Sequence, residues 1–269
     1  MDKKLLMEIN TRTVKKANAL IQQSRFELSA QQQKMLLYLI SQIEPTDKEF
    51  QLYEFDLKHF CAVCNIEQYA GKNYNDLRNA IKSIADKSLW VETTTGEETL
   101  LRWIEKPYID KKNNKVRIRL DEDMKPFLLQ LKKNYTYYEL VWTLQFKSKY
   151  SIRLYELIKS IHYHELEEYE REYPLEEIQR LLNAEKYKRW QHLKEKVLEI
   201  AVREINLYSD KIVSYEPIKA RGSKAVCGIR LKVKSKSGDD SLKLRVEIEQ
   251  KYELNQLSLW DLERLNDGK

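Results

Sequence analysis

Two histidines two residues apart, His162 and His164, are the pair best suited to hold a metal ion, and 17 tyrosines could supply a nucleophile. Metal-dependent DNA nickases combine such a His-hydrophobic-His pair with an attacking tyrosine. That chemistry needs both imidazoles on one side, as at positions i and i+2 of a strand. Here the pair ends a helical pattern, in which i and i+2 point about 200° apart. No other histidine is close enough in sequence to complete a ligand set, so nickase activity is the less favoured hypothesis.

A second candidate metal site combines Cys61 and Cys64 with the nearby His59. A structural zinc site needs four ligands at defined spacing. The segment FDLKHFCAVCNI has a helical pattern, and only Cys227 remains elsewhere. We therefore expect these cysteines to pack in the core and predict no metal and no cofactor. The sequence also has no phosphate-binding G-x-x-x-x-G-K-[ST] loop and no Ser/His/Asp constellation, so we predict that the protein is not an enzyme.

Composition sets the broad class of the protein. The 269 residues suggest about two domains, and 42% apolar residues are enough for a packed core. No apolar run reaches the length of a transmembrane helix, and the N-terminus does not have the pattern of a signal peptide. Three cysteines are an odd number for a disulfide framework, so reduced thiols and a cytoplasmic location are expected. The net charge of +6 permits a nucleic-acid partner.

The positive charge is concentrated in one part of the chain. Between Lys186 and Lys236, 14 Lys and Arg residues accompany 5 acids, a net charge of +9. The preceding segment HELEEYEREYPLEE is strongly acidic. A charged helix face is often only solvated, but here basic residues occupy both a helix start and a hairpin that follows it. This asymmetry is typical of a nucleic-acid interface.

The elements that would position these residues recur at an offset near 118 residues. Each half contains three segments with the i, i+4, i+7 spacing of an amphipathic helix, followed by a hairpin pattern. The matched apolar positions in the first and third helices are Leu36, Leu39, Ile40, Ile43, Leu77, Ile81, Ile84 and Ala85 in the first half and Leu154, Leu157, Ile158, Ile161, Leu193, Val197, Ile200 and Ala201 in the second. The hairpins are expected within 91–121 and 214–233.

This order of elements predicts a helix-rich α+β fold made of tandem duplicated winged helix-turn-helix domains. The expected divisions are an N-terminal arm at 1–14, a winged-helix domain at 15–132, a docked linker at 133–145, a second winged-helix domain at 146–236 and a C-terminal tail at 237–269. In such domains the third helix reads DNA bases and the hairpin is the wing.

The candidate DNA-binding residues follow from this arrangement. On the third helix of the second half they are Lys188, Arg189, Gln191, His192, Lys196 and Arg203, and on its wing Lys219, Arg221 and Lys224. In the first half they are Lys72, Asn73, Asn75, Arg78, Asn79 and Lys82 on the third helix and Lys111, Lys112 and Lys115 at the wing tip. Helix residues can reach base edges, whereas wing residues are expected to contact phosphates. We call each third helix with its wing a reader. Two readers that bind successive major-groove faces predict a site of about 20 bp.

The segments SIRLYELIKS, AVREIN and SYEPIKARG…GIRLKV resemble the iteron-binding replication initiators of theta-replicating plasmids, over about residues 15–236. The resemblance implies binding to repeated origin sites as a monomer and opening of the duplex with host replication proteins, including a helicase. It also implies a dimer, joined through the N-terminal domain, that represses the initiator's own gene. The recognition residues that it carries over are Lys188, Arg189, His192, Lys196 and Arg203. A transcriptional regulator built on the same domains is the main alternative.

The tail contains a short motif that resembles the peptide by which bacterial replication proteins bind the sliding clamp. It consists of Gln256, Leu257, Ser258, Leu259 and Trp260, where Phe is usual at the last position. Apolar side chains could fill a groove while the glutamine fixes their orientation. The alternative is an amphipathic helix that packs back on the protein.

Overall fold

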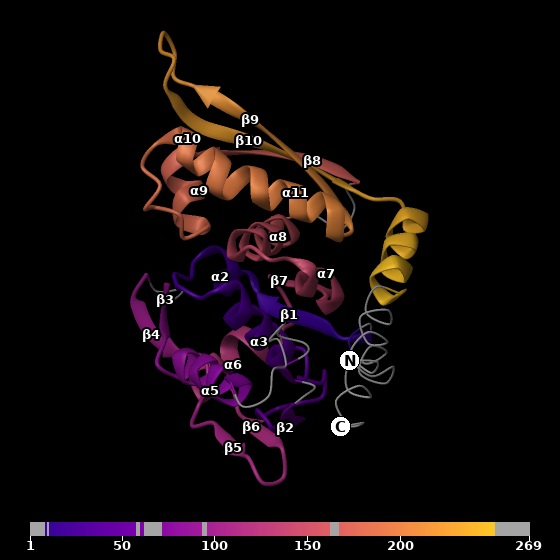
Figure 1. Ribbon diagram of the computed structural model, residues 1–269. Coiled ribbons are helices and arrows are strands. Elements are labelled where there is room, and N and C mark those ends of the chain that lie inside the picture. The colour runs from indigo at the N-terminus through magenta and orange to yellow at the C-terminus, as the bar shows by residue number, and fades with distance from the viewer. Residues whose placement is uncertain are drawn as a thin grey trace.

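The computed structural model describes residues 9, 11–57, 60–61, 72–92, 96–161 and 167–250. Figure 1 shows two lobes, with the first half of the chain in the lower lobe and the second half in the upper one. The buried apolar side chains of both lobes belong to one continuous core cluster. No helix in the described segments is both long and apolar enough to cross a membrane.

The upper lobe is built from a helical layer against a three-stranded sheet. Its elements are α8 (Lys149–Ile161), β8 (Glu168–Pro174), α9 (Leu175–Leu181), α10 (Trp190–Leu193), η2 (Lys194–Leu198), α11 (Glu199–Tyr208), β9 (Lys211–Lys219) and β10 (Val226–Ser235). The strands pair in the order β8-β10-β9, all antiparallel. Strands β9 and β10 confirm the predicted hairpin and its turn.

Strand β8 was not predicted, because its sequence EYEREYP is mostly charged. Its odd-numbered tyrosines, Tyr169 and Tyr173, turn toward the core, and Tyr173 is almost fully buried. Glu170 and Glu172 lie on the opposite face, in register with basic residues of β10. The acidic segment is thus a strand whose glutamates lie opposite basic residues only once β8 pairs with β10.

The lower lobe contains most of the chain's short elements. They are β1 (Thr13–Ala17), α2 (Asn18–Gln22), α3 (Ala30–Ile40), β2 (Tyr53–Asp56), α5 (Lys72–Ala85), β3 (Ser88–Glu92), β4 (Glu98–Arg102), β5 (Tyr108–Asp110), β6 (Lys115–Ile118), η1 (Glu122–Met124), α6 (Lys125–Leu128), β7 (Tyr135–Glu139) and α7 (Leu140–Gln145). Helix α3 begins with a capping box in which Ser29 and Gln32 satisfy each other's backbone N–H groups.

The hairpin expected within 91–121 is two hairpins, which corrects the prediction. Strands β3 and β4 pair with each other, whereas β5 and β6 form a separate hairpin that joins β2 in the order β2-β6-β5. This order repeats the β8-β10-β9 order of the upper lobe, so β5–β6 corresponds to the wing and β3–β4 is additional. Apolar periodicity could not separate them, because both hairpins are short and share one continuous strand-like stretch.

The segment expected to be a linker, 133–145, is part of the lower lobe. Strand β7 pairs with β1 over five residues, and helix α7 follows it directly. Five consecutive residues of α7, from Leu140 to Leu144, are buried. The two lobes are therefore not separated by an exposed connection.

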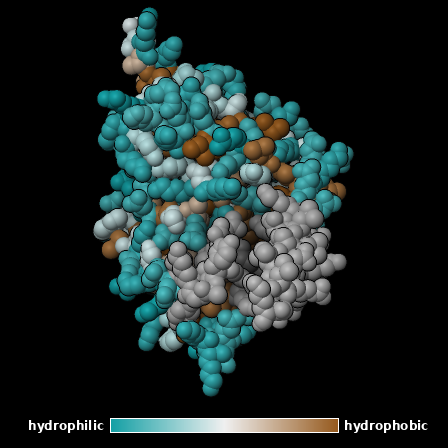
Figure 2. Space-filling model, in the orientation of Figure 1, coloured by the Kyte–Doolittle hydropathy of each residue, from teal (hydrophilic) through white to brown (hydrophobic). Residues whose placement is uncertain are grey.

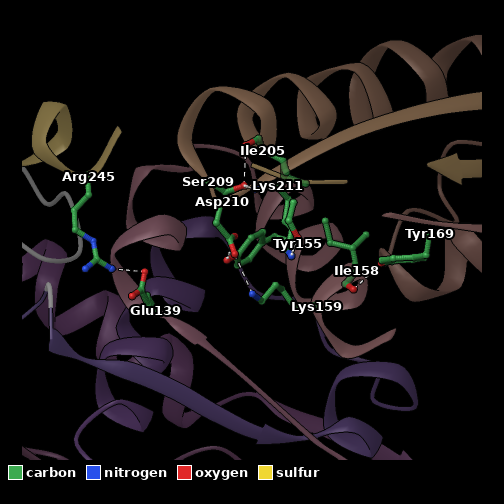
Figure 3. A network of polar contacts seen from close by, with 11 residues as sticks. Glu139, Tyr155, Ile158, Lys159, Tyr169, Ile205, Ser209, Asp210, Lys211 and Arg245 are labelled. Carbon is green, nitrogen blue, oxygen red and sulfur yellow. Dashed lines mark hydrogen bonds and ion pairs between the residues drawn. The ribbon is translucent and has the colours of Figure 1, made fainter. Parts of the chain in front are cut away.

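Helix α8 lies between the lobes and contacts both of them. It packs against α2, α3 and β7 on one side and α11 on the other. In Figure 3, Tyr155 and Lys159 of α8 reach Asp210, with O–O and N–O distances of 2.7 and 3.1 Å. Burial opposes ionisation of Asp210, but Lys159, Lys211 and the Tyr155 hydrogen bond together hold the pKa of Asp210 below its ordinary value.

A second buried network ties α8 to the lower lobe. Lys16 Nζ and Tyr138 Oη both donate to Glu156 Oε1, at 2.6 and 2.5 Å. Arg153 donates to the carbonyl oxygens of Ile21 and Leu181, at 3.1 and 3.0 Å. Because Ile21 and Leu181 belong to different lobes, these two hydrogen bonds of Arg153 link the lobes.

A helix over residues 238–250 follows the upper lobe and packs back on the lower one (Figure 1). Ile248 is buried, Arg245 forms an ion pair with Glu139, and its guanidinium lies 5.6 Å from the centroid of the Trp142 ring. The first part of the tail therefore packs on the protein. The clamp-like motif at 256–260 lies outside the described residues.

Candidate nucleic-acid interface

The third helix of the upper lobe presents all its predicted polar residues to solvent. Lys188 and Arg189 precede the helix, and Arg189 is its extended N-cap residue. The others lie along α10, η2 and α11: Gln191, His192, Lys196 and Arg203 are all exposed. Gln191 Nε2 donates to Glu195 Oε1 at 2.5 Å, so its amide is already engaged within the helix.

The core-facing side of this helix differs from the prediction at one position. Ile200 is only half-buried, whereas Leu198 is fully buried beside Val197 and Ala201. The cause is the π-helical turn η2, which adds a residue to the turn and rotates the following segment. A regular 3.6-residue period cannot anticipate such a turn.

The tip of the β9–β10 hairpin is basic and fully exposed. Lys219, Arg221 and Lys224 extend from it, and in the part of the chain that the structure describes none of the three has an ion-pair partner. Gly222 has φ +73°, a conformation that favours glycine in this turn. Figure 2 shows the hydrophilic tip projecting away from the upper lobe. Three uncompensated cations on a projecting turn suit contact with phosphates.

Two other basic residues of the hairpin, Arg230 and Lys232, are neutralised within the sheet. Arg230 Nη2 donates to Glu172 at 2.5 Å, and Lys232 Nζ lies 2.8 Å from Glu216 and 3.5 Å from Glu170. The Lys232 hydrogen bond lowers the pKa of Glu216. The linear charge count of +9 therefore overstates the positive charge of the interface, which is concentrated at the hairpin tip and along the third helix.

The corresponding helix of the lower lobe, α5, begins at Lys72 and Asn73. Leu77, Ile81 and Ile84 face its core. The outward positions Asn75, Arg78, Asn79 and Lys82 are exposed, and Lys82 forms an i,i+4 ion pair with Asp86. Helix α5 therefore offers amide and guanidinium groups at the same place in the topology as α10–α11.

The lower wing places Lys111 and Lys112 at its exposed turn, in agreement with the predicted position. Asp110 accepts from the backbone and side chain of Asn113, at 3.0 and 2.8 Å, which closes the turn. Lys115 does not lie at the tip: it starts strand β6 and pairs with Glu54 at 3.4 Å. Its role in DNA binding stays a prediction.

Of the residues considered for metal chemistry, Cys61 is buried, and burial raises the pKa of its thiol to about 11. Cys227 is exposed on β10. His59, Cys64, His162 and His164 lie outside the described residues. Over the described ranges, no group of three or more His, Cys, Asp or Glu side chains is placed to hold a metal ion.

Comparison with known proteins identifies relatives over both lobes. The family model "Initiator Replication protein, WH1" matches residues 13–159, and "Initiator Rep protein, WH2" matches residues 174–233. A "Replication initiation protein" of Escherichia coli is 26% identical over 195 residues, 70% of this chain and 60% of that protein's length. The crystal structure of the Pi initiator protein in complex with iteron DNA covers 85% of this chain and 99% of that chain, with TM-score 0.68 and 15% identity.

Proposed function

The chain belongs to the initiator replication protein family, and from this premise we propose that it binds repeated sites in duplex DNA and initiates replication there. The observation that carries the proposal is the repeated topology of the two lobes. Sheets ordered β2-β6-β5 and β8-β10-β9 each accompany a third helix with an exposed polar face. Two such readers on one chain can engage successive major grooves.

The proposal assigns different roles to the helix and the wing. Lys188 and Lys196 reach base edges, so alanine at either position weakens specific binding by about 1–3 kcal/mol. Lys219 and Arg221 contact phosphates, so alanine there lowers the slope of log K against log salt by about one per contact. The protein acts by binding in this account, and the duplex is opened with the help of host proteins.

The test begins with the full chain and a pool of random-sequence duplexes. The expected result is enrichment of a site of about 20 bp with two recognisable halves. Lys232→Gln is the matched control for the wing variants, since Lys232 is on the same hairpin but is already paired with glutamates. An unchanged salt slope in Lys219→Ala and Arg221→Ala, or no enriched site at all, would refute the assignment.

An origin-dependent replication assay in a host that lacks the gene separates an initiator from a transcriptional regulator. An initiator supports replication of a plasmid that carries the repeats, whereas a regulator only changes transcription. Incubation with supercoiled origin DNA and Mg²⁺ or Mn²⁺ tests the nickase alternative, and nicked product would contradict a purely binding role.

Two partner proposals follow from family membership. We propose that copies associate through the lower, N-terminal lobe into a dimer that represses its own gene, which sedimentation and a promoter reporter can test.

We also propose that the tail motif binds the sliding clamp of the host. Leu259→Ala with Trp260→Ala should abolish clamp pull-down while DNA binding is retained; undiminished pull-down would contradict the clamp role.

A further inference from the structure

The β3–β4 hairpin has no counterpart in the upper lobe. There, only two residues separate the end of α11 at Tyr208 from the start of β9 at Lys211. In the lower lobe, α5 ends at Ala85 and the corresponding strand β5 starts at Tyr108. The intervening residues fold into the extra hairpin. The role of the wing that follows it therefore does not indicate the function of the β3–β4 hairpin.

The two faces of this hairpin differ in burial. Leu89, Val91 and Leu101 lie on the inner face and are at most 5% exposed. Trp90 and Leu100 are directly opposite each other on the outer face, with 48% and 52% of their surface exposed. Single exposed apolar residues are ordinary on a protein surface. Two large apolar side chains next to each other on the outer face of a short hairpin are less common and indicate an interaction site.

Two guanidinium groups extend this apolar pair. Arg25 and Trp90 exchange backbone hydrogen bonds of 3.0 and 3.3 Å, and residues directly opposite in an antiparallel pairing share a face. Arg102 lies one row along, opposite Ser88. Both arginines are exposed, and neither has an ion-pair partner within the segments that the structure describes. We call Arg25, Trp90, Leu100 and Arg102 the insert face.

The β3–β4 hairpin, which carries the insert face, lies between the two readers. In Figure 1, α10, the β3–β4 hairpin and α5 follow one another down one side of the molecule. Readers in successive major grooves are about one helical turn of 10 bp apart, and between them the minor groove faces the protein. A surface element between two such readers therefore meets the minor groove and its sugar-phosphate edges.

We propose that the insert face binds the minor groove between the two half-sites, an inference that rests on the proposed function. Arginine is drawn to the negative potential of a narrow minor groove, and apolar side chains pack on the sugars or wedge between base steps. Glu98 is on the same face but toward the tip of the hairpin, where it repels phosphates. The contact is therefore made by the base of the hairpin.

The experiment compares the full chain with Trp90→Ser plus Leu100→Ser on a duplex that carries one repeat selected by the parent protein. Loss of the apolar contact should weaken binding about ten-fold and leave the salt slope unchanged. Arg25→Ala and Arg102→Ala should each lower the slope by about one. Hydroxyl-radical footprinting should show lost protection between the two major-groove contacts, because that reagent cuts along the minor groove.

Leu242→Ser plus Val246→Ser is the matched control, since it removes an exposed apolar pair from the C-terminal helix, away from the hairpin. The control should bind and footprint like the parent. If the parent selects no site, both this inference and the proposed function fail. If the parent binds and the Trp90/Leu100 variant has the same affinity and footprint, only this inference fails. A variant that binds DNA normally but loses self-association in sedimentation would assign the face to a second copy and overturn the DNA contact.

Discussion

Replacing Glu156 by glutamine tests whether the buried ion pair holds α8 to the lower lobe. Glu156 is 1% exposed, and Lys16, at 5% exposed, donates to it at 2.6 Å. Glutamine keeps the shape and an acceptor for Tyr138 but removes the negative charge. The ammonium of Lys16 is then left buried without a counter-charge.

The magnitude follows from that uncompensated charge. Breaking a buried pair by removing one partner costs about 3–5 kcal/mol. Because glutamine retains the hydrogen-bond acceptor, we expect a loss near the lower end, about 3 kcal/mol. For a chain of this size that is about 6–12 °C in Tm, and a large part of a typical total stability of about 5–15 kcal/mol. Urea and thermal unfolding measure it directly.

The control is the double variant Lys16→Met with Glu156→Gln. It removes both charges while Tyr138 keeps its acceptor, so it should recover most of the stability lost in the single variant. A single variant as stable as the parent would refute the reasoning. So would a double variant that is as unstable as the single one, because the loss would then not come from the uncompensated ammonium of Lys16.

The same pair predicts an acid dependence. Burial opposes ionisation of Glu156, but Lys16, Arg153 and the hydrogen bonds from Lys16 and Tyr138 hold the pKa of Glu156 below its ordinary 4.5. A lowered carboxyl pKa contributes stability that is present above the unfolded value and is lost as pH falls through the folded value. The parent should therefore lose more stability than Glu156→Gln below about pH 4.5. Equal acid sensitivity would contradict this.

Three further predictions concern the upper lobe and the C-terminal helix. Burial, with a smaller effect of a neighbouring lysine, lowers the pKa of Lys211 from 10.5 to about 8. The stability of the protein should therefore rise as pH increases between these two values, and Lys211→Met should remove that rise in urea titrations. A Cβ at Gly228 would come within 2.7 Å of the Tyr173 carbonyl oxygen, so Gly228→Ala should cost about 1–3 kcal/mol in unfolding experiments, whereas Gly238→Ala, with open space, should not. Arg245→Ala removes an ion pair and a cation–π contact, so it should cost about 1 kcal/mol and speed hydrogen exchange in helix 238–250; unchanged exchange would show that the contact does not hold the helix.

The sequence by itself determined the long amphipathic helices α3, α5, α8 and α10–α11, the β9–β10 hairpin and the polar face of the third helix. Helix periodicity and turn chemistry are local, so Leu77, Ile81 and Leu193 could be placed in the core from spacing alone. The exposed tip of Lys219, Arg221 and Lys224 follows equally from its turn residues.

Only the tertiary structure decided which strands pair and which charges remain free. The acidic segment 168–174 became the edge strand β8, and its glutamates neutralised Arg230 and Lys232 of β10, because cross-strand contacts join residues far apart in sequence. The same non-local pairing split the stretch 91–121 into a wing and an extra hairpin. It also brought Arg25 beside Trp90, a contact that no spacing rule predicts, since the two residues are 65 positions apart in the printed sequence.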